Sequence, residues 1–140
     1  NDFKVYAQKI VNNAKTMAES FMELGYNLVS DGTDTHVMLI DLTNKNISGK
    51  KAEKVLENAG ITVNKNMVPF DKRSPFVTSG IRVGTPAITT REMGKEEMKN
   101  IVSMIDAVII DPDNNKNTHR IKTEVIKLCE SYPIYKEFST

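Results

Sequence analysis

The sequence predicts an α+β fold, with a small and mostly antiparallel sheet and helices packed mainly on one of its faces. The elements are expected in the order helix, strands, helix, strands and two helices, which is typical of this layered class. A short turn joins the strands after the first helix, so they are expected to pair as an antiparallel hairpin. The chain has 140 residues, the size of one domain, and shows no internal repeat and no second domain.

The first helix is predicted from an apolar stripe that ends just before Gly25, a residue suited to terminating a helix. Strands are expected at 26–29 and 36–42, with a turn at 30–33 between them. The run Val-Met-Leu-Ile at 37–40 favours burial of the second strand on both faces. The stripe of the first helix consists of Phe3, Tyr6, Ile10, Ala14, Met17, Phe21 and Leu24.

Ser48 is expected to cap a second helix of about ten residues, which Gly60 stops. After it come a short extended piece at 61–63, an irregular segment, a strand at 80–84 and a turn at 85–87. The inward residues of this second helix are expected to be Ala52, Val55, Leu56 and Ala59.

Two further helices are predicted toward the C-terminus. One spans 94–108, a turn-rich loop follows at 111–117, and Thr118 is expected to cap the last helix, which Pro133 ends. The inner face of the third helix is expected to carry Met98, Ile101, Val102, Ile105 and Val108 or Ile109, and that of the last helix Ile121, Val125, Leu128 and Tyr132.

The composition argues against several classes of function. Charged residues make up 26% of the chain and the formal net charge is +1, so no charge excess indicates nucleic-acid or membrane-surface binding. No apolar run approaches the roughly 18 residues of a membrane span. The single Cys129 cannot form an internal disulfide, and no Cys/His cluster has the spacing of a metal site. These features favour a reducing compartment, the cytoplasm, and predict no metal site.

The segment 63–87 is the most informative part of the chain. It holds three of the five prolines together with several amides and hydroxyls, and it also carries apolar residues that are expected to need burial, Phe70 and Phe76 among them. A disordered linker lacks such residues, and a plain strand lacks so many turn formers. The segment is therefore interpreted as an ordered, irregular loop that leads into a strand and presents groups to a small molecule.

Arg82 lies between Ile81 and Val83, with glycines at 80 and 84. Its planar guanidinium is suited to two parallel hydrogen bonds with a carboxylate. A solvated surface arginine on a half-exposed strand is the competing interpretation, and the spacing alone favours it. The glycines argue for the close approach of a ligand or another backbone.

Polar residues near the prolines have two interpretations as well. Asn64, Asn66 and Ser74 stand close to Pro69 and Pro75, and such residues usually satisfy turns. The irregular stretch is about 15 residues long, however, which is longer than most loops without a function.

Taken together, these strings resemble the C-terminal part of serine hydroxymethyltransferase. The similarity rests on Asn-Lys-Asn at 64–66 and on Ser-Pro-Phe-Val-Thr-Ser-Gly-Ile-Arg-Val-Gly-Thr-Pro-Ala at 74–87. It extends to Gly-Thr-Asp-Thr-His at 32–36 and Thr-Thr-Arg at 89–91, and is expected over essentially the whole chain.

The resemblance implies a fold, an activity and site residues. The fold is that of the C-terminal domain of fold-type I transferases that depend on pyridoxal phosphate. The activity is the interconversion of serine and tetrahydrofolate with glycine and 5,10-methylenetetrahydrofolate, by an intact parent that is a homodimer. Arg82 is implied to bind the carboxylate of the amino-acid substrate. Asn66, Ser74, Pro75 and Phe76 are implied to form part of the folate site.

The cofactor lysine of the family lies in a Thr-Thr-His-Lys string, which these 140 residues do not contain. The chain also begins Asn-Asp-Phe without a methionine. We therefore expect residues 1–140 to be a single small domain whose large cofactor-binding domain lies upstream, and expect this domain to be inactive alone, with no catalytic residue of its own. The alternative is a stand-alone folate or anionic-metabolite binding module without catalysis. The mass of the whole gene product separates the two hypotheses.

Overall fold

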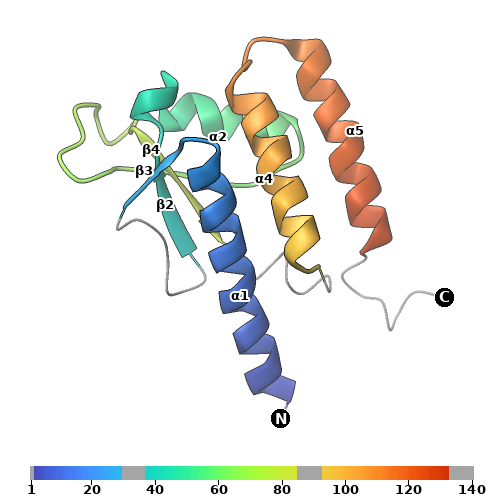
Figure 1. Ribbon diagram of the computed structural model, residues 1–140. Helices are drawn as coiled ribbons and strands as arrows, with labels where there is room; N and C mark the ends of the chain where they lie inside the picture. The colour runs from blue at the N-terminus through green and yellow to red at the C-terminus, as the bar shows by residue number, and fades with distance from the viewer. Residues whose placement is uncertain (1, 30–36, 85–92, 133–140) are drawn as a thin grey trace.

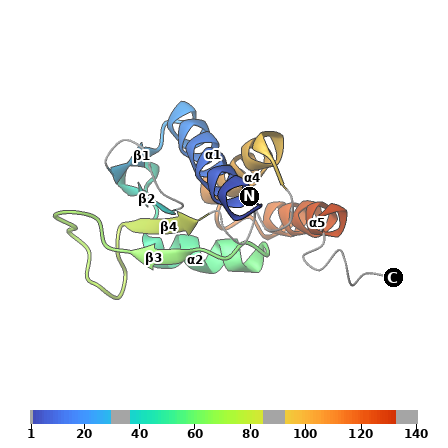
Figure 2. The same ribbon diagram turned by 90° about the horizontal axis from the view of Figure 1, so that it is seen from below.

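The computed structural model describes residues 2–29, 37–84 and 93–132. Three long helices lie side by side, with α4 (Lys95–Ile109) between α1 (Asp2–Glu23) and α5 (Asn115–Ser131) (Figures 1 and 2). A shorter helix, α2 (Gly49–Asn58), contacts α4 and α5 and two strands of the sheet. The predicted α+β class is confirmed.

The sheet has four antiparallel strands in the order β1-β2-β4-β3. The hairpin predicted after the first helix is present as β1 (Asn27–Leu28) and β2 (Val37–Asp41), and the strand predicted at 80–84 is β4 (Gly80–Gly84). The edge strand β3 (Asn64–Asn66) pairs with β4. The sequence placed these three residues in irregular structure, because polar amides near prolines are typical of turns.

One face of the sheet packs against the helices. Met38 pairs with Val83 and Ile40 with Ile81, and all four side chains are buried in the same core as the helix stripes. On the opposite face Leu39 is half-buried and its partner Arg82 is exposed. The prediction that β2 is buried on both faces was therefore wrong, because the helices among the described residues cover one side and leave Val37, Leu39 and Asp41 half-buried on the other.

The ends of the helices follow local chemistry. Gly25 has φ +86°, and the amide of Tyr26 donates to the carbonyl of Phe21 (3.0 Å), which closes α1 as a Schellman motif. Ser48 caps α2 as predicted, since its hydroxyl accepts from the amide of Lys51. The cap of α5 is Asn114, not Thr118. The Asn114 side chain accepts from the amide of Asn117 (3.0 Å), so the helix starts one turn earlier than predicted.

Most of the predicted inward residues are buried or packed against the core, including those of the second and third helices. Phe3 and Leu24, at the ends of the α1 stripe, are exposed. The predicted turns at 30–33 and 85–87, the family strings at 32–36 and 89–91 and the end of the last helix at Pro133 lie outside the described residues.

Candidate functional site

Arg82 lies in the middle of the open face of the sheet. Its neighbours in register are Leu39 on β2 and Asn64 on β3. The side chain of Arg82 is exposed, and within the described residues its guanidinium forms no ion pair or hydrogen bond. An exposed guanidinium in this position is free to receive a carboxylate through two parallel hydrogen bonds.

Two asparagines of β3 share the face of Arg82. Asn64 lies opposite Arg82, and Asn66 lies opposite Gly80, two residues away along β4. Residues that face each other or are two apart on a strand point to the same side of a sheet. The Asn66 amide nitrogen donates to the carbonyl of Met67 (2.9 Å). Sequence reasoning treated Asn64 only as a turn residue, because nothing in the sequence reveals the register of β3.

The glycine at 80 is explained by packing inside the chain. A Cβ atom there would lie 2.7 Å from Cγ1 of Val68 and 2.9 Å from the carbonyl oxygen of Ile40. Val68 is buried, so the chain leaving β3 folds back over the start of β4. The close approach predicted from this glycine therefore exists, and the group that approaches belongs to the protein.

The β3–β4 loop, residues 67–79, projects from one edge of the molecule (Figures 1 and 2). It is ordered and irregular, as predicted. Val68 is buried, whereas Phe70 and Phe76 are 100% and 79% exposed. The expectation that these two rings are buried was wrong, because the loop turns outward and the core lies on the other side of the sheet.

The carboxylate of Asp71 organises this loop. It accepts hydrogen bonds from the amides of Val68 (3.2 Å), Arg73 (2.9 Å) and Ser79 (2.8 Å), and from the hydroxyl of Ser79 (2.6 Å). Burial raises the pKa of Asp71, but the hydrogen bonds from Ser79, Arg73 and Val68 outweigh it and lower the pKa to about 2. Sequence reasoning missed Asp71, although an aspartate two residues after a proline is a known turn signal.

The Ser-Pro-Phe turn at 74–76 lies at the exposed part of the loop. The carbonyl of Ser74 accepts from the amides of Val77 (3.0 Å) and Thr78 (2.8 Å), which closes the turn. Lys65 on β3 donates from Nζ to the carbonyl of Phe76 (2.8 Å). These contacts hold the turn beside β3 and leave the side chains of Ser74, Pro75 and Phe76 exposed.

The N-terminus of α2 supports the end of the same loop. The amide of Gly49 donates to the carbonyl of Thr78 (3.0 Å), and that of Lys50 to the carbonyl of Val77 (2.9 Å). Free amides at the start of a helix need such acceptors. The loop is thus fixed to the helix layer at one end and to the sheet at the other.

The structure brings the predicted residues together in two groups. Arg82 and Asn66 lie on one open sheet face, and Ser74, Pro75 and Phe76 lie on the adjoining loop. A hollow of about 340 Å³ lies between the end of β2 and the loop, lined by Asp41, Thr43, residues 68–73 and Ser79. Arg82, on the open face, is not among the residues that line this hollow.

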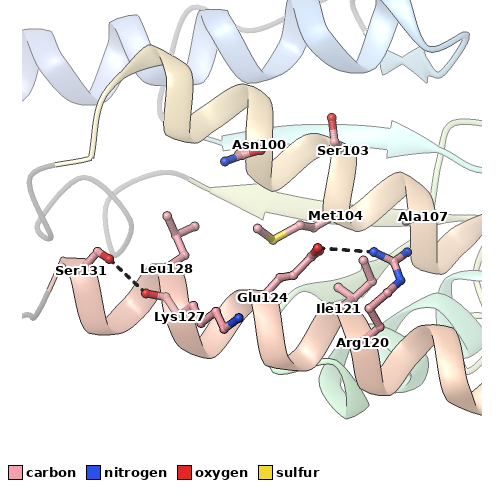
Figure 3. Close-up of a pocket in the computed structure, with 10 residues that line it drawn as sticks. All are labelled: Asn100, Ser103, Met104, Ala107, Arg120, Ile121, Glu124, Lys127, Leu128 and Ser131. Carbon is pink, nitrogen blue, oxygen red and sulfur yellow. Dashed lines mark hydrogen bonds and ion pairs between the residues drawn. The ribbon is translucent and has the colours of Figure 1, made fainter.

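A second hollow, of about 460 Å³, is a groove between α4 and α5. Figure 3 shows residues that line it, among them Met104 of α4, Ile121 of α5 and the pair of Arg120 with Glu124 (3.4 Å). None of the predicted site residues lines it.

The described residues show neither a metal-binding cluster nor a membrane-spanning helix. They hold no group of three or more His, Cys, Asp or Glu side chains placed to bind a metal ion. None of their helices is long and apolar enough to cross a membrane.

A comparison with protein-family models matches residues 1–105 to the family described as serine hydroxymethyltransferase. The matched range contains the whole open face, the β3–β4 loop and most of α4, and it ends before α5. The resemblance expected over the whole chain is therefore confirmed for residues 1–105. The chain belongs to the serine hydroxymethyltransferase family.

Proposed function

We propose that this chain is the substrate-binding small domain of an enzyme that interconverts serine and tetrahydrofolate with glycine and 5,10-methylenetetrahydrofolate. The observation that carries the proposal is the exposed guanidinium of Arg82 in the middle of the open sheet face, which pairs with no other group of residues 2–29, 37–84 and 93–132. Arg82 binds the carboxylate of serine or glycine. A two-pronged contact fixes the orientation of the amino acid as well as its position.

The adjoining loop forms the folate part of the site. Asn66 supplies an amide beside Arg82, and Ser74, Pro75 and Phe76 supply a hydroxyl, a turn and an exposed ring. A bicyclic heteroaromatic ligand requires an apolar surface with a few directed polar groups. The exposure of Phe76 on a loop held by its backbone supports this role.

The residues described here do not fit a pyridoxal phosphate anchor. A lysine that holds this cofactor covalently is deprotonated in a desolvated pocket. No lysine in the described ranges is buried, and Lys45, Lys51 and Lys65 already bind backbone carbonyls or a carboxylate. We place the cofactor, which the family generally uses, on a separate large domain of a cytoplasmic homodimer, and expect this domain alone to be inactive.

The test is Arg82→Lys in the intact enzyme. A lysine cannot reproduce the two parallel hydrogen bonds, so we expect serine affinity to fall by about tenfold to a hundredfold. Serine titration of the purified enzyme, followed by calorimetry or by the cofactor absorbance, measures this. Arg120→Lys makes the same exchange in the groove between α4 and α5 and is expected to leave serine affinity unchanged. Unchanged affinity in Arg82→Lys would remove Arg82 from the site.

A further inference from the structure

The carboxylate of Asp71 joins the two ends of the β3–β4 loop. Val68 lies just after β3 and Ser79 just before β4, and both donate backbone amides to the same oxygen of Asp71 (3.2 and 2.8 Å). The other oxygen accepts from the amide of Arg73 and the hydroxyl of Ser79. One side chain thus fixes the start, the middle and the end of the loop.

The contacts of Ser79 extend this network in two directions. Nη1 of Arg73 donates to the Ser79 hydroxyl (3.1 Å), and the Ser79 carbonyl accepts from the amide of Leu42 (2.8 Å). Leu42 directly follows β2 and is fully buried. The network therefore ties the exposed loop to the core of the sheet.

Arg82 is held by different contacts. Its strand is paired on both sides, with β2 and β3, and its neighbours Ile81 and Val83 are buried. Loss of the Asp71 carboxylate removes none of these contacts. Arg82 on β4 and the β3–β4 loop are therefore held in place by separate interactions.

We propose that Asp71 is a positioning residue for the folate part of the site: its carboxylate holds residues 68–79, and with them Ser74, Pro75 and Phe76, in position to contact the folate. This inference rests on the proposed folate role of the loop. A carboxylate suits the position because it accepts four hydrogen bonds and donates none. An asparagine of the same shape places an amide N–H₂ group against at least one of the backbone donors.

The first test is Asp71→Asn in the intact enzyme. We expect the KM for tetrahydrofolate to rise by about tenfold, because a displaced loop weakens folate binding before and during the reaction alike. The kcat at saturating tetrahydrofolate and the affinity for serine are expected to stay within about twofold of the wild-type values, because the strand pairing and buried neighbours that hold Arg82 are unchanged. Asp111→Asn makes the same exchange at an exposed carboxylate that accepts from Asn114, and is expected to change none of these values.

The second test follows the loop itself. Lys72 and Arg73 are trypsin sites inside the loop. The hydrogen bonds of Asp71 keep the loop closed, so it is expected to resist cleavage at these two residues. We expect cleavage at these residues to be about tenfold faster in Asp71→Asn than in the wild type or in Asp111→Asn, since proteolysis follows local opening. Ser79→Ala removes the shortest contact of Asp71 and keeps its charge. Ser79→Ala is expected to raise the KM for tetrahydrofolate and the cleavage rate by smaller factors. It replaces Asp71→Asn in both tests if that variant does not fold.

The outcomes separate this inference from the proposed function. A wild-type enzyme that binds neither serine nor tetrahydrofolate overturns the proposed function and this inference with it. A wild type that binds both, together with variants that are cleaved faster but keep the wild-type KM for tetrahydrofolate, overturns this inference alone. Equal losses of serine and folate affinity in Asp71→Asn also overturn it, because they indicate a general loss of structure.

Discussion

Close contacts with two residues require a glycine at position 49. An added Cβ atom would overlap the side-chain oxygen of Thr78 and the carbonyl oxygen of Gly80. Both partners lie in the segment that ends the β3–β4 loop and begins β4. Thr78 is itself buried and has φ +61°, a strained conformation for a β-branched residue. The contact between α2 and the loop is therefore tight and has little room to adjust.

We predict that Gly49→Ala destabilises the protein by about 1–3 kcal/mol, the range for overpacking a close contact. Chemical denaturation measures the change. Gly94→Ala is the control, because a Cβ atom there would lie an ordinary 3.6 Å from Oε1 of Glu97. Its expected cost is below about 1 kcal/mol, the difference between glycine and alanine at a helix cap. Equal effects of the two changes would show that the Thr78 contact is not restrictive.

Asp71 gives the stability a defined dependence on pH. Its pKa is about 2 in the folded chain, against an ordinary value of 3.8. A lowered pKa means that the ionised carboxylate stabilises the fold above about pH 4, and that this contribution is lost as the pH falls toward 2. We predict that the difference in Tm between wild type and Asp71→Asn is constant from pH 5 to 7 and shrinks below about pH 4. A difference that stays constant down to pH 2 would contradict the assignment.

At the scale of the element, α2 depends on its cap and its docking on the loop. Ser48 satisfies the amide of Lys51, while the amides of Gly49 and Lys50 donate to loop carbonyls. The helix has only ten residues, and helices of this length are marginal in isolation. Its order therefore depends on these end contacts and on the burial of its apolar face.

We predict that Ser48→Ala costs about 1 kcal/mol of stability, the usual value for losing a helix cap. Because the cap adjoins the loop end at Thr78, the change is also expected to speed tryptic cleavage at Arg73. Ser103→Ala is the matched control, an exposed position inside α4 where alanine favours the helix. Thermal denaturation of the two variants checks the first expectation, and a cap variant as stable as the control would refute it.

At the scale of the whole molecule, the four most exposed large apolar side chains of the described residues lie at two places. Phe3 and Val5, at the projecting start of α1, are 76% and 68% exposed, and Phe70 and Phe76 of the loop are exposed as well. Apolar side chains that gather on a surface usually mark contacts with another protein or a ligand. We expect these places to face the large domain or the folate in the proposed enzyme.

We predict that the isolated chain self-associates at high concentration, and that Phe3→Ser combined with Val5→Ser reduces the association. Light scattering across a concentration series measures the average mass. Ile126→Ser, at a third exposed position on α5, controls for the general effect of a lost apolar side chain. A monomer at every concentration would contradict the prediction.

The elements that the sequence predicted well are those with a long apolar repeat. The α1 and α4 stripes recur at helical spacing, and Ser48, Gly25 and Gly60 mark helix ends by local chemistry that needs no distant partner. The start of α5 was misplaced because Asn114 and Thr118 are both suitable caps. The choice between them depends on contacts such as that of Asn117 with the carbonyl of Ala107.

The sequence by itself determined the fold class and the helix faces and singled out the segment of the candidate site, because apolar spacing, capping residues and family strings are local properties of the chain. Only the tertiary structure decided that Asn64–Asn66 form an edge strand beside Arg82. It also decided that Phe70 and Phe76 face outward and that Asp71 closes the loop. Register, exposure and hydrogen bonding join residues far apart in sequence, and depend on which face of the sheet the helices cover.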